Sequence, residues 1–395
     1  MIQDFASIIA PLTPETFERE YLGRKPLYLE AGPERFREVM NWQVLNRLLG
    51  MNTIWSQASL ELVLDGQRLP PQAYASPAPG RDGGQVLRPE VERVKSYLRR
   101  GATLVLNDID QLTPELSAFC RALETALGCR VQANLYMSSK KRQGFHVHAD
   151  NHDVLAVHFE GEKRWFVFEG RAEWPIAHPM FESIPQEVHE KAKGELWREV
   201  RMKPGDLLYL PRGQYHYALA EEGGCIHIAF GLTWPIGLDV MSYLYERMVQ
   251  ESLGRQDLPR REEELRDYLQ RLGARLRELA SDSKTLADLK ALQRRWRWPR
   301  ENYDLPELLT APSPRFRLKA RGLRLLRQNG KQLLVDQRNR RAVEVPEDYV
   351  PLVSWVLARD GFPREAFDAA FSDRPKELRE RVLKDLEAMA VVAPA

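Results

Sequence analysis

The chain has 395 residues, of which 43% are hydrophobic and 29% charged, and its formal net charge is +2. This length allows two or three domains with well-buried cores, and the composition excludes a disordered or fibrous protein. Because the net charge is small, any electrostatic argument about partners must come from local clusters.

The cysteines and the apolar segments indicate the compartment. Cys120, Cys129 and Cys225 are too few and too scattered for a disulfide framework or a zinc knot. Asp4 stands where a signal peptide needs basic residues, and no stretch approaches the roughly 20 apolar residues of a membrane helix. We therefore expect a cytoplasmic protein without a membrane segment.

The first part of the chain mixes helices and strands. Thr13-Pro14-Glu15 and Thr113-Pro114-Glu115 each predict a helix start, because threonine caps a helix and proline suits its first turn. The second helix is predicted to end at Gly128. Residues 25–29 read as a strand.

Short strands dominate from about Val131 to Trp234. The pattern predicts strands over residues 154–159, 164–168, 206–210 and 225–232, and a hairpin turn at Glu160-Gly161-Glu162. Many short strands at close spacing indicate an antiparallel barrel or sandwich.

The chain then becomes helical, with helices predicted over about residues 238–253, after Pro259, and over 284–296. Two apolar stripes follow helical spacing and predict either an internal core or a dimer interface: Leu238, Met241, Leu244 and Met248, then Leu265, Leu269, Leu272 and Leu276. Residues 301–395 predict a small α+β domain, for which a winged helix is our interpretation, with a hairpin over 333–345 and three helical segments.

A possible metal site lies in the strand-rich segment. In His148-Ala149-Asp150, two ligands alternate as they would on one strand, so both side chains can reach a common ion. The run from Gly205 to His216 predicts a strand, a tight Pro/Gly turn and a histidine aimed back into the barrel mouth. Two histidines and one carboxylate form the facial triad of non-haem Fe(II) oxygenases.

A lysine lies between the two parts of this possible metal site. Lys163 comes directly after the Glu160-Gly161-Glu162 turn, fifteen residues beyond His148. A cation at the inner end of the barrel can pair with a dicarboxylate whose other end chelates the metal. A solvated lysine in a charged turn is the alternative reading of this position.

These stretches resemble a known family. HADNHDVLAVHFEGEKRW, from His148, and GDLLYLPRGQYHYA, which contains His216, are similar to the JmjC-domain ribosomal oxygenases, which hydroxylate ribosomal proteins. The resemblance implies that His148, Asp150 and His216 are the catalytic iron ligands. It further implies that Lys163 binds the distal carboxylate of 2-oxoglutarate.

The resemblance also implies supporting contacts to the co-substrate from Asn134 and Tyr136, which lie in the stretch ANLYMSS. One position departs from the pattern, because related JmjC hydroxylases often carry a hydroxyl residue three positions before the first histidine, where this chain has Phe145.

The implied fold is mainly β with α: a double-stranded β-helix of the JmjC and cupin type, a helical dimerisation region and a winged-helix-like domain. The expected boundaries are 1–234 for the catalytic domain, with its β-helix core at about 131–234, then 235–300 and 301–395.

The expected activity is Fe(II)- and 2-oxoglutarate-dependent hydroxylation, with O2, of a side chain in a protein or peptide. A ribosomal protein is the substrate that the resemblance favours. A methylated lysine, a modified peptide or a tRNA base also fits this chemistry, so the sequence does not identify the substrate.

Two other functions fit parts of the sequence. An ordinary cupin enzyme acting on a small molecule would use His146, His148, Asp153 and His216, and would leave Lys163 without a role. A nucleic-acid-binding regulator would use the stretch 315–341, which has ten Arg or Lys residues and one acidic residue. A solvated basic face is the simpler interpretation of that stretch.

Overall fold

The computed structural model describes residues 4–80, 83–139, 145–221, 223–300, 315–319, 323–328, 330–336 and 341–394. They form two compact units, residues 1–300 and residues 301–395. All three cysteines are buried and free. Within the described residues, no helix combines the length and the apolar character that a membrane crossing requires.

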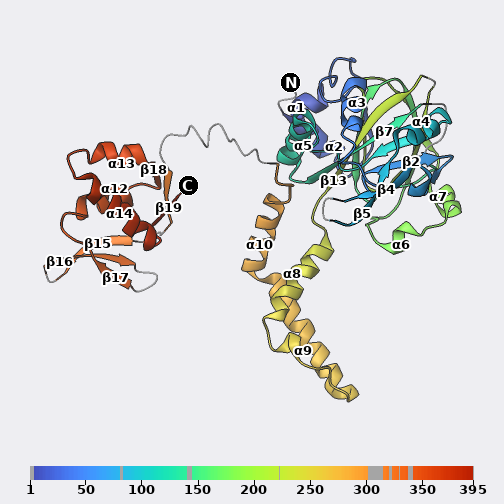
Figure 1. The fold of residues 1–395 in the computed structure, drawn as a ribbon. Helices are drawn as coiled ribbons and strands as arrows, with labels where there is room; N and C mark the ends of the chain where they lie inside the picture. The colour runs from blue at the N-terminus through green and yellow to red at the C-terminus, as the bar shows by residue number, and fades with distance from the viewer. Residues whose placement is uncertain are drawn as a thin grey trace. The chain divides into compact units, whose positions relative to one another are not determined.

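The first unit is built on an antiparallel sheet of eight strands in the order β1-β11-β8-β13-β7-β6-β2-β3. Figure 1 labels β2, β7 and β13 of this sheet. The strands are β1 (Leu27–Leu29), β2 (Leu60–Leu64), β3 (Gln67–Arg68), β6 (Thr103–Leu106), β7 (Arg130–Ser138), β8 (Asp153–Glu160), β11 (Leu207–Leu210) and β13 (Cys225–Thr233). The long central strands β7, β8 and β13 carry the β-branched and aromatic residues that favour a pleated, buried surface.

A second sheet of three strands faces β8 and β11. It has the order β10-β9-β12, with β9 at Lys163–Arg171, β10 at Leu196–Met202 and β12 at Gln214–Ala220. Val154 and Ala156 of the large sheet pack against Trp165 and Val167 of the small one in a single buried cluster. Two antiparallel sheets closed over a shared core confirm the predicted double-stranded β-helix.

The outer face of the large sheet is covered by helices. Because side chains alternate along a strand, Leu155 and Val157 point away from the barrel interior and join a larger core with Phe17 and Phe119. The helices of this part are α1 (Phe5–Ile9), α2 (Pro14–Glu20), α3 (Trp42–Gly50), α4 (Val91–Arg99), α5 (Pro114–Leu127), α6 (Pro179–Glu182) and α7 (Gln186–Ala192). Two short elements complete it, the 3-10 helix η1 (Pro71–Ala73) and the hairpin β4 (Ala75–Pro79) and β5 (Gln85–Pro89).

The predicted helix ends of α2 and α5 are confirmed. The hydroxyl oxygens of Thr13 and Thr113 each accept a hydrogen bond from a backbone N–H of the first turn. Helix α5 ends at Gly128, which adopts the left-handed conformation with φ of 59°.

The predicted hairpin at Glu160-Gly161-Glu162 is wrong. Strand β8 pairs with β11 and β13, whereas β9 pairs with β10 and β12, so this turn carries the chain from one sheet to the other. Two strands and a glycine turn look alike locally in both arrangements, and only the distant partners decide between them. Gly161 has φ of 66°, and a Cβ there would clash with the carbonyl of Gly224.

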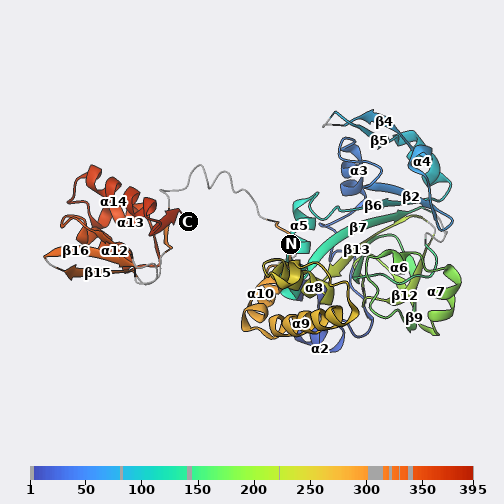
Figure 2. The same cartoon turned by 90° about the horizontal axis from the view of Figure 1, so that it is seen from below.

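A helical segment follows the last strand of the barrel (Figure 2). It comprises α8 (Gly237–Val249), the 3-10 helix η2 (Leu253–Arg255), α9 (Glu262–Ser281) and α10 (Ser283–Arg294). The predicted apolar stripes divide between two environments. Leu244 and Met248 are buried with Leu279, and Leu272 packs against them, but Leu238, Met241 and Leu269 are more than half exposed.

Buried charges anchor the end of this segment to the barrel. The Arg300 guanidinium donates to Glu124 of α5 at 2.9 Å, to Asp110 at 2.6 Å and to the carbonyl of Val131 at 2.7 Å. The Arg300 and Glu124 side chains are each only 2% exposed. Two carboxylates and a carbonyl therefore compensate the cost of burying this cation.

The second unit is a small α+β domain, as predicted. It has two three-stranded sheets, β18-β14-β19 and β15-β16-β17, and a core of its own that includes Phe316, Leu352 and Phe367. The strands are β14 (Arg315–Leu318), β15 (Leu323–Gln328), β16 (Lys331–Asp336), β17 (Arg341–Glu344), β18 (Gly361–Pro363) and β19 (Val392–Pro394). The helices are α12 (Val350–Leu357), α13 (Arg364–Ala370) and α14 (Lys376–Ala388). The β16–β17 hairpin and the three helices lie where the sequence predicts them.

Removing one member of the Arg300 cluster tests this anchor. We expect Glu124→Ala to lower the free energy of unfolding by about 3–5 kcal/mol, because it leaves a buried cation short of a partner. Urea denaturation followed by tryptophan fluorescence measures the change. Asp267→Ala removes the partner of Arg271 in an exposed pair on α9 and should cost no more than about 0.5 kcal/mol. Equal losses in the two variants would contradict a structural role for the buried cluster.

Candidate metal centre

Two backbone segments bring the candidate ligands together. His148 and His216 form an isolated antiparallel bridge, in which each backbone N–H donates to the other residue's carbonyl at 3.1 and 3.0 Å. His216 belongs to β12, whereas His148 and Asp150 precede β8, which begins only at Asp153. The prediction that His148 and Asp150 share a regular strand is therefore wrong. Their alternation still holds, because the segment is extended and tied to β12 on one side.

The three side chains converge on one point. Nε2 of His216 lies 3.5 Å from Oδ2 of Asp150, and Nε2 of His148 lies 4.0 Å from Oδ1. One ligand atom from each residue lies within 4.8 Å of the others. The side chain of His216 is 5% exposed, while His148 and Asp150 are 38% and 29% exposed, so the cluster opens on one side.

Both imidazoles are oriented for ligation. Nδ1 of His148 lies 2.8 Å from the carbonyl of His146, and Nδ1 of His216 lies 2.9 Å from the carbonyl of Gln214. A carbonyl only accepts, so each Nδ1 carries the proton and donates it. Each Nε2 is then left with a free lone pair that faces the cluster, which is the arrangement of metal-binding histidines.

The surroundings of the cluster favour the protonation states that bind a metal. Burial disfavours the charged carboxylate of Asp150, but the adjacent imidazoles of His148 and His216 outweigh it and lower its pKa. Burial and the neighbouring His148 lower the pKa of His216 to about 4, against the opposing effect of Asp150. At neutral pH the cluster therefore offers a carboxylate and a neutral imidazole without prior loss of protons.

These residues fit an Fe(II) ion. Two imidazole nitrogens and one carboxylate oxygen, all on one side of a common point, are the donor set of non-haem Fe(II) oxygenases. Both histidines are fixed by second contacts to the backbone, so the site is held in place by the fold rather than by the ion.

Lys163 lies in the same cavity, at the start of β9. It is 7% exposed, and its Nζ lies 3.4 Å from Nδ1 of His227. Burial lowers the pKa of Lys163, and no carboxylate among the described residues pairs with it. Burial and the nearby Lys163 also lower the pKa of His158 to about 3. The cavity therefore holds a buried lysine for which the described part of the chain supplies no carboxylate partner, so an anionic ligand would favour its charged form.

Asn134 and Tyr136 line the cavity from β7. The register pairs Tyr136 with His227 of β13, and their rings stack with centroids 4.9 Å apart. The Asn134 side chain accepts a hydrogen bond from the backbone N–H of Asp108 at 3.1 Å, which fixes its position. The predicted co-substrate contacts thus face the same cavity as Lys163 and the triad.

The cavity has a volume of about 290 Å³. Some of the residues that line it are not among those that the sequence predicts. Trp165 stacks on His216 with ring centroids 5.6 Å apart, and its place two residues after Lys163 on β9 was a usable signal. Glu61 and Asn107 are hydrogen-bonded to each other at the cavity wall. No motif marks them, because β2 and the end of β6 reach the site only through sheet pairing.

His146 and Asp153 do not join the cluster, although the ordinary cupin interpretation needs them as ligands. The imidazole of His146 lies against Gly66, where an added Cβ would clash with it. Asp153 accepts hydrogen bonds from the hydroxyl of Tyr209 and the backbone N–H of Arg212. Among the described residues, the metal-binding group consists of His148, Asp150 and His216. Phe145 lines the cavity and packs edge-on against Tyr136.

Known proteins that are similar to this chain include JmjC-domain oxygenases. Residues 106–240 match the family described as JmjC domain. The chain is 28% identical over 279 residues to the bifunctional lysine-specific demethylase and histidyl-hydroxylase NO66 of Dictyostelium discoideum, covering 68% of this chain and 50% of that protein. It is 25% identical over 244 residues to ribosomal oxygenase 2 of Mus musculus, covering 60% of this chain and 47% of that protein. The chain spans about half the length of these curated relatives.

The fold is also similar to that of YcfD, a ribosomal oxygenase from Escherichia coli whose structure was solved in complex with cobalt and 2-oxoglutarate. The TM-score is 0.50 at 18% identity, and the alignment covers 97% of this chain and 98% of that one. This likeness supports the fold of the chain as a whole. Residues 106–240 thus match a JmjC domain, and the chain is similar in sequence to NO66 and to a ribosomal oxygenase.

Proposed function

We propose that this protein is an Fe(II)- and 2-oxoglutarate-dependent oxygenase that hydroxylates a side chain of a protein, with ribosomal proteins as its substrate class. The observation that carries the proposal is the pairing of two features in one cavity: a three-residue metal cluster at its opening and the buried, carboxylate-free Lys163 inside it. A metal-chelating dicarboxylate satisfies both at once.

His148, Asp150 and His216 would hold the iron through Nε2, a carboxylate oxygen and Nε2. Bound Fe(II) lets O2 convert 2-oxoglutarate to succinate and CO2 while one C–H bond of the substrate becomes C–OH. Three protein ligands leave positions for both 2-oxoglutarate and O2. Because Asp150 supplies the carboxylate, no position is left over for a halide, which favours hydroxylation.

Lys163 would bind the far carboxylate of 2-oxoglutarate by a charge-assisted hydrogen bond. Its buried position makes this contact strong, since water competes weakly there. Tyr136, His227 and Trp165 form an aromatic wall around the same space and exclude water from it. Asn134, held by the Asp108 backbone, would orient the co-substrate by a further hydrogen bond.

The substrate class rests on the relatives, which are named as a histidyl-hydroxylase and demethylase and as ribosomal oxygenases. We also propose that the protein is cytoplasmic, because its three scattered cysteines suit a reducing compartment.

We further propose a homodimer formed through the helical segment. Leu238, Met241 and Tyr245 of α8 and Leu269 of α9 expose between 53% and 66% of their surface. An apolar face of this kind on a helical segment is typical of an interface with a second copy. Most of the other residues of the predicted stripes pack in the core of the helical segment, whereas this apolar face has no partner in it.

The basic stretch 315–341 would strengthen docking to RNA-rich assemblies. Arg315, Arg317, Arg324 and Arg327 are exposed on β14 and β15, while part of the stretch lies outside the described residues. Direct nucleic-acid binding remains a prediction from the sequence.

The iron site is tested by Asp150→Ala. We expect loss of stoichiometric iron and of succinate formation, with the fold retained, because the cluster loses its anionic ligand. Mass spectrometry of lysate proteins treated with the wild-type enzyme should show peptides heavier by one oxygen atom, which the variant does not produce. His146→Ala is the matched control and should keep both iron and turnover. Wild-type activity in Asp150→Ala would refute the triad.

Lys163→Ala tests the co-substrate site separately. Loss of a charge-assisted hydrogen bond of about 1.5–3 kcal/mol should raise the KM for 2-oxoglutarate roughly tenfold or more, with iron binding retained. Lys203→Ala, at an exposed position outside the cavity, should leave this KM unchanged. If the KM of Lys163→Ala equals that of the wild type, another cation binds the carboxylate.

The dimer is tested by the double variant Met241→Asp and Leu269→Asp. Both side chains are more than half exposed, so the fold should persist while charges enter the interface and give a monomer. Light scattering at micromolar concentration measures the molar mass. Val188→Asp, an apolar position of α7 with 47% exposure, should remain dimeric. A monomeric wild-type protein would rule out the proposed interface.

A further inference from the structure

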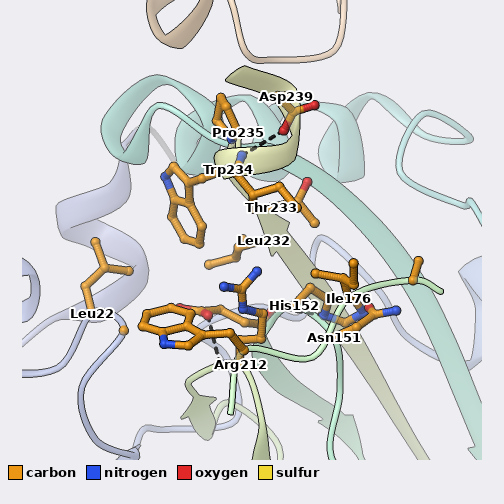
Figure 3. A pocket seen from close by; sticks show the side chains of 15 residues that line it. Leu22, Asn151, His152, Ile176, Arg212, Leu232, Thr233, Trp234, Pro235 and Asp239 are labelled. Atoms are coloured by element: carbon orange, nitrogen blue, oxygen red, sulfur yellow. Dashed lines mark hydrogen bonds between the residues drawn. The ribbon is translucent and has the colours of Figure 1, made fainter. Parts of the chain in front are cut away.

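A second cavity lies beside the metal centre. We name it the Trp174 pocket, and its volume is about 540 Å³ (Figure 3). His152 lines both this pocket and the metal cavity. The other residues that matter to its chemistry are Leu22, Trp174, Arg212, Leu232 and Trp234.

The walls of the pocket are largely apolar and partly rigid. The indole of Trp234 is fixed, because its Nε1 donates to the carbonyl of Leu127 at 3.0 Å. Leu232 is fully buried beneath it. Trp174 is 61% exposed and has φ of 43°, a left-handed conformation that is costly for a tryptophan. A strained backbone that holds a large aromatic ring towards solvent is typical of a binding surface.

One cation projects into this apolar space. Figure 3 shows the guanidinium of Arg212 in the middle of the pocket, and its central carbon lies 4.7 Å from the centre of the Trp174 ring. Among the described residues, the guanidinium makes neither an ion pair nor a hydrogen bond, whereas the backbone N–H of Arg212 donates to Asp153 at 2.8 Å. Arg212 is therefore positioned by its backbone and by Trp174, and its donors remain free.

The carboxylates near the pocket are already engaged. Asp153 accepts hydrogen bonds from the Tyr209 hydroxyl and from the backbone N–H of Arg212. Asp239 caps α8 by accepting from the backbone N–H of Ile236 at 2.7 Å, and Figure 3 places it across the pocket from Arg212. An anion from outside would thus meet a guanidinium that stacks on an aromatic ring and lacks a partner.

The pocket is within reach of a chain bound at the metal. Asn151 lines it and directly follows Asp150, so the two Cα atoms are about 3.8 Å apart. An extended polypeptide advances about 3.3–3.5 Å per residue. A substrate whose target residue lies over the triad can therefore place a residue a few positions away in the Trp174 pocket.

We propose that the Trp174 pocket binds a segment of the protein substrate, with an apolar side chain between Trp174 and Trp234 and an adjacent carboxylate on Arg212. This inference rests on the proposed function, because it takes the occupant to be part of the hydroxylated protein. The pocket would then select substrates by an apolar and acidic pair close to the target residue, independently of the contacts that the target residue itself makes.

The test uses a peptide probe and needs no turnover. The full-length, metal-free protein is labelled with 5-fluorotryptophan, and the Trp174 resonance is assigned in the ¹⁹F spectrum with Trp174→Phe. We expect acetyl-Leu-Glu-amide to shift this resonance saturably and acetyl-Leu-Gln-amide to bind about tenfold more weakly. Arg212→Gln should remove this difference, because the guanidinium is what distinguishes the two peptides.

Two further variants keep the test decisive. Arg212→Lys keeps the charge and should retain part of the preference for the acidic peptide. Arg266→Gln removes an exposed arginine of α9 and should change nothing. The remaining tryptophan resonances report whether each variant is folded.

Equal binding of the two peptides, or an unchanged preference in Arg212→Gln, would overturn the proposal. A shift produced by the free acid 4-phenylbutyrate and by neither peptide would also overturn it, in favour of a small-molecule site. Because the titration contains neither iron nor 2-oxoglutarate, its failure leaves the succinate assay unaffected, and a failed succinate assay leaves the titration unaffected.

Discussion

The reciprocal backbone pairing of His148 and His216 is the constraint on which the centre depends. It joins the segment before β8, in the large sheet, to β12, in the small sheet, at the mouth of the barrel. Side chains of directly paired residues lie on the same side of the strands, so this pairing alone places the two imidazoles next to each other. A neighbouring bond, from the Gly213 N–H to the carbonyl of Asp150 at 2.9 Å, fixes the third ligand relative to the other two. The metal geometry is thus a consequence of main-chain register.

Three basic side chains in the first unit differ in whether the protein supplies an anionic partner, and this difference distinguishes a structural role from a ligand-binding one. Arg300 is buried with two carboxylates and a carbonyl. These partners compensate its charge within the protein, which indicates a structural role. Lys163 is buried next to His227 without an anion, and Arg212 projects into an apolar pocket with its donors free. Burying an uncompensated cation costs free energy, so a fold retains one where a ligand supplies the missing charge.

Local signals predicted much of the fold. Thr113 and Gly128 delimit α5 as expected, since capping is decided within a few residues of the chain. The sequence predicts the wrong partners for the strands around Gly161, because strand partners are chosen by long-range packing, which a short motif does not encode. The triad was foreseeable because it belongs to two compact motifs. Glu61, by contrast, reaches the cavity through the pairing of β2, β6 and β7, and a single sequence holds no local trace of that pairing.

The burial of all three cysteines has a consequence for the proposed chemistry. A centre that combines iron with O2 exposes its surroundings to oxidants, and the thiolate is the form of cysteine that oxidants attack first. Burial raises the pKa of Cys120, Cys129 and Cys225 alike, even though Lys163 acts in the opposite direction on Cys225. Under the proposed function, all three thiols therefore stay protonated and shielded from the oxidants that the site would generate.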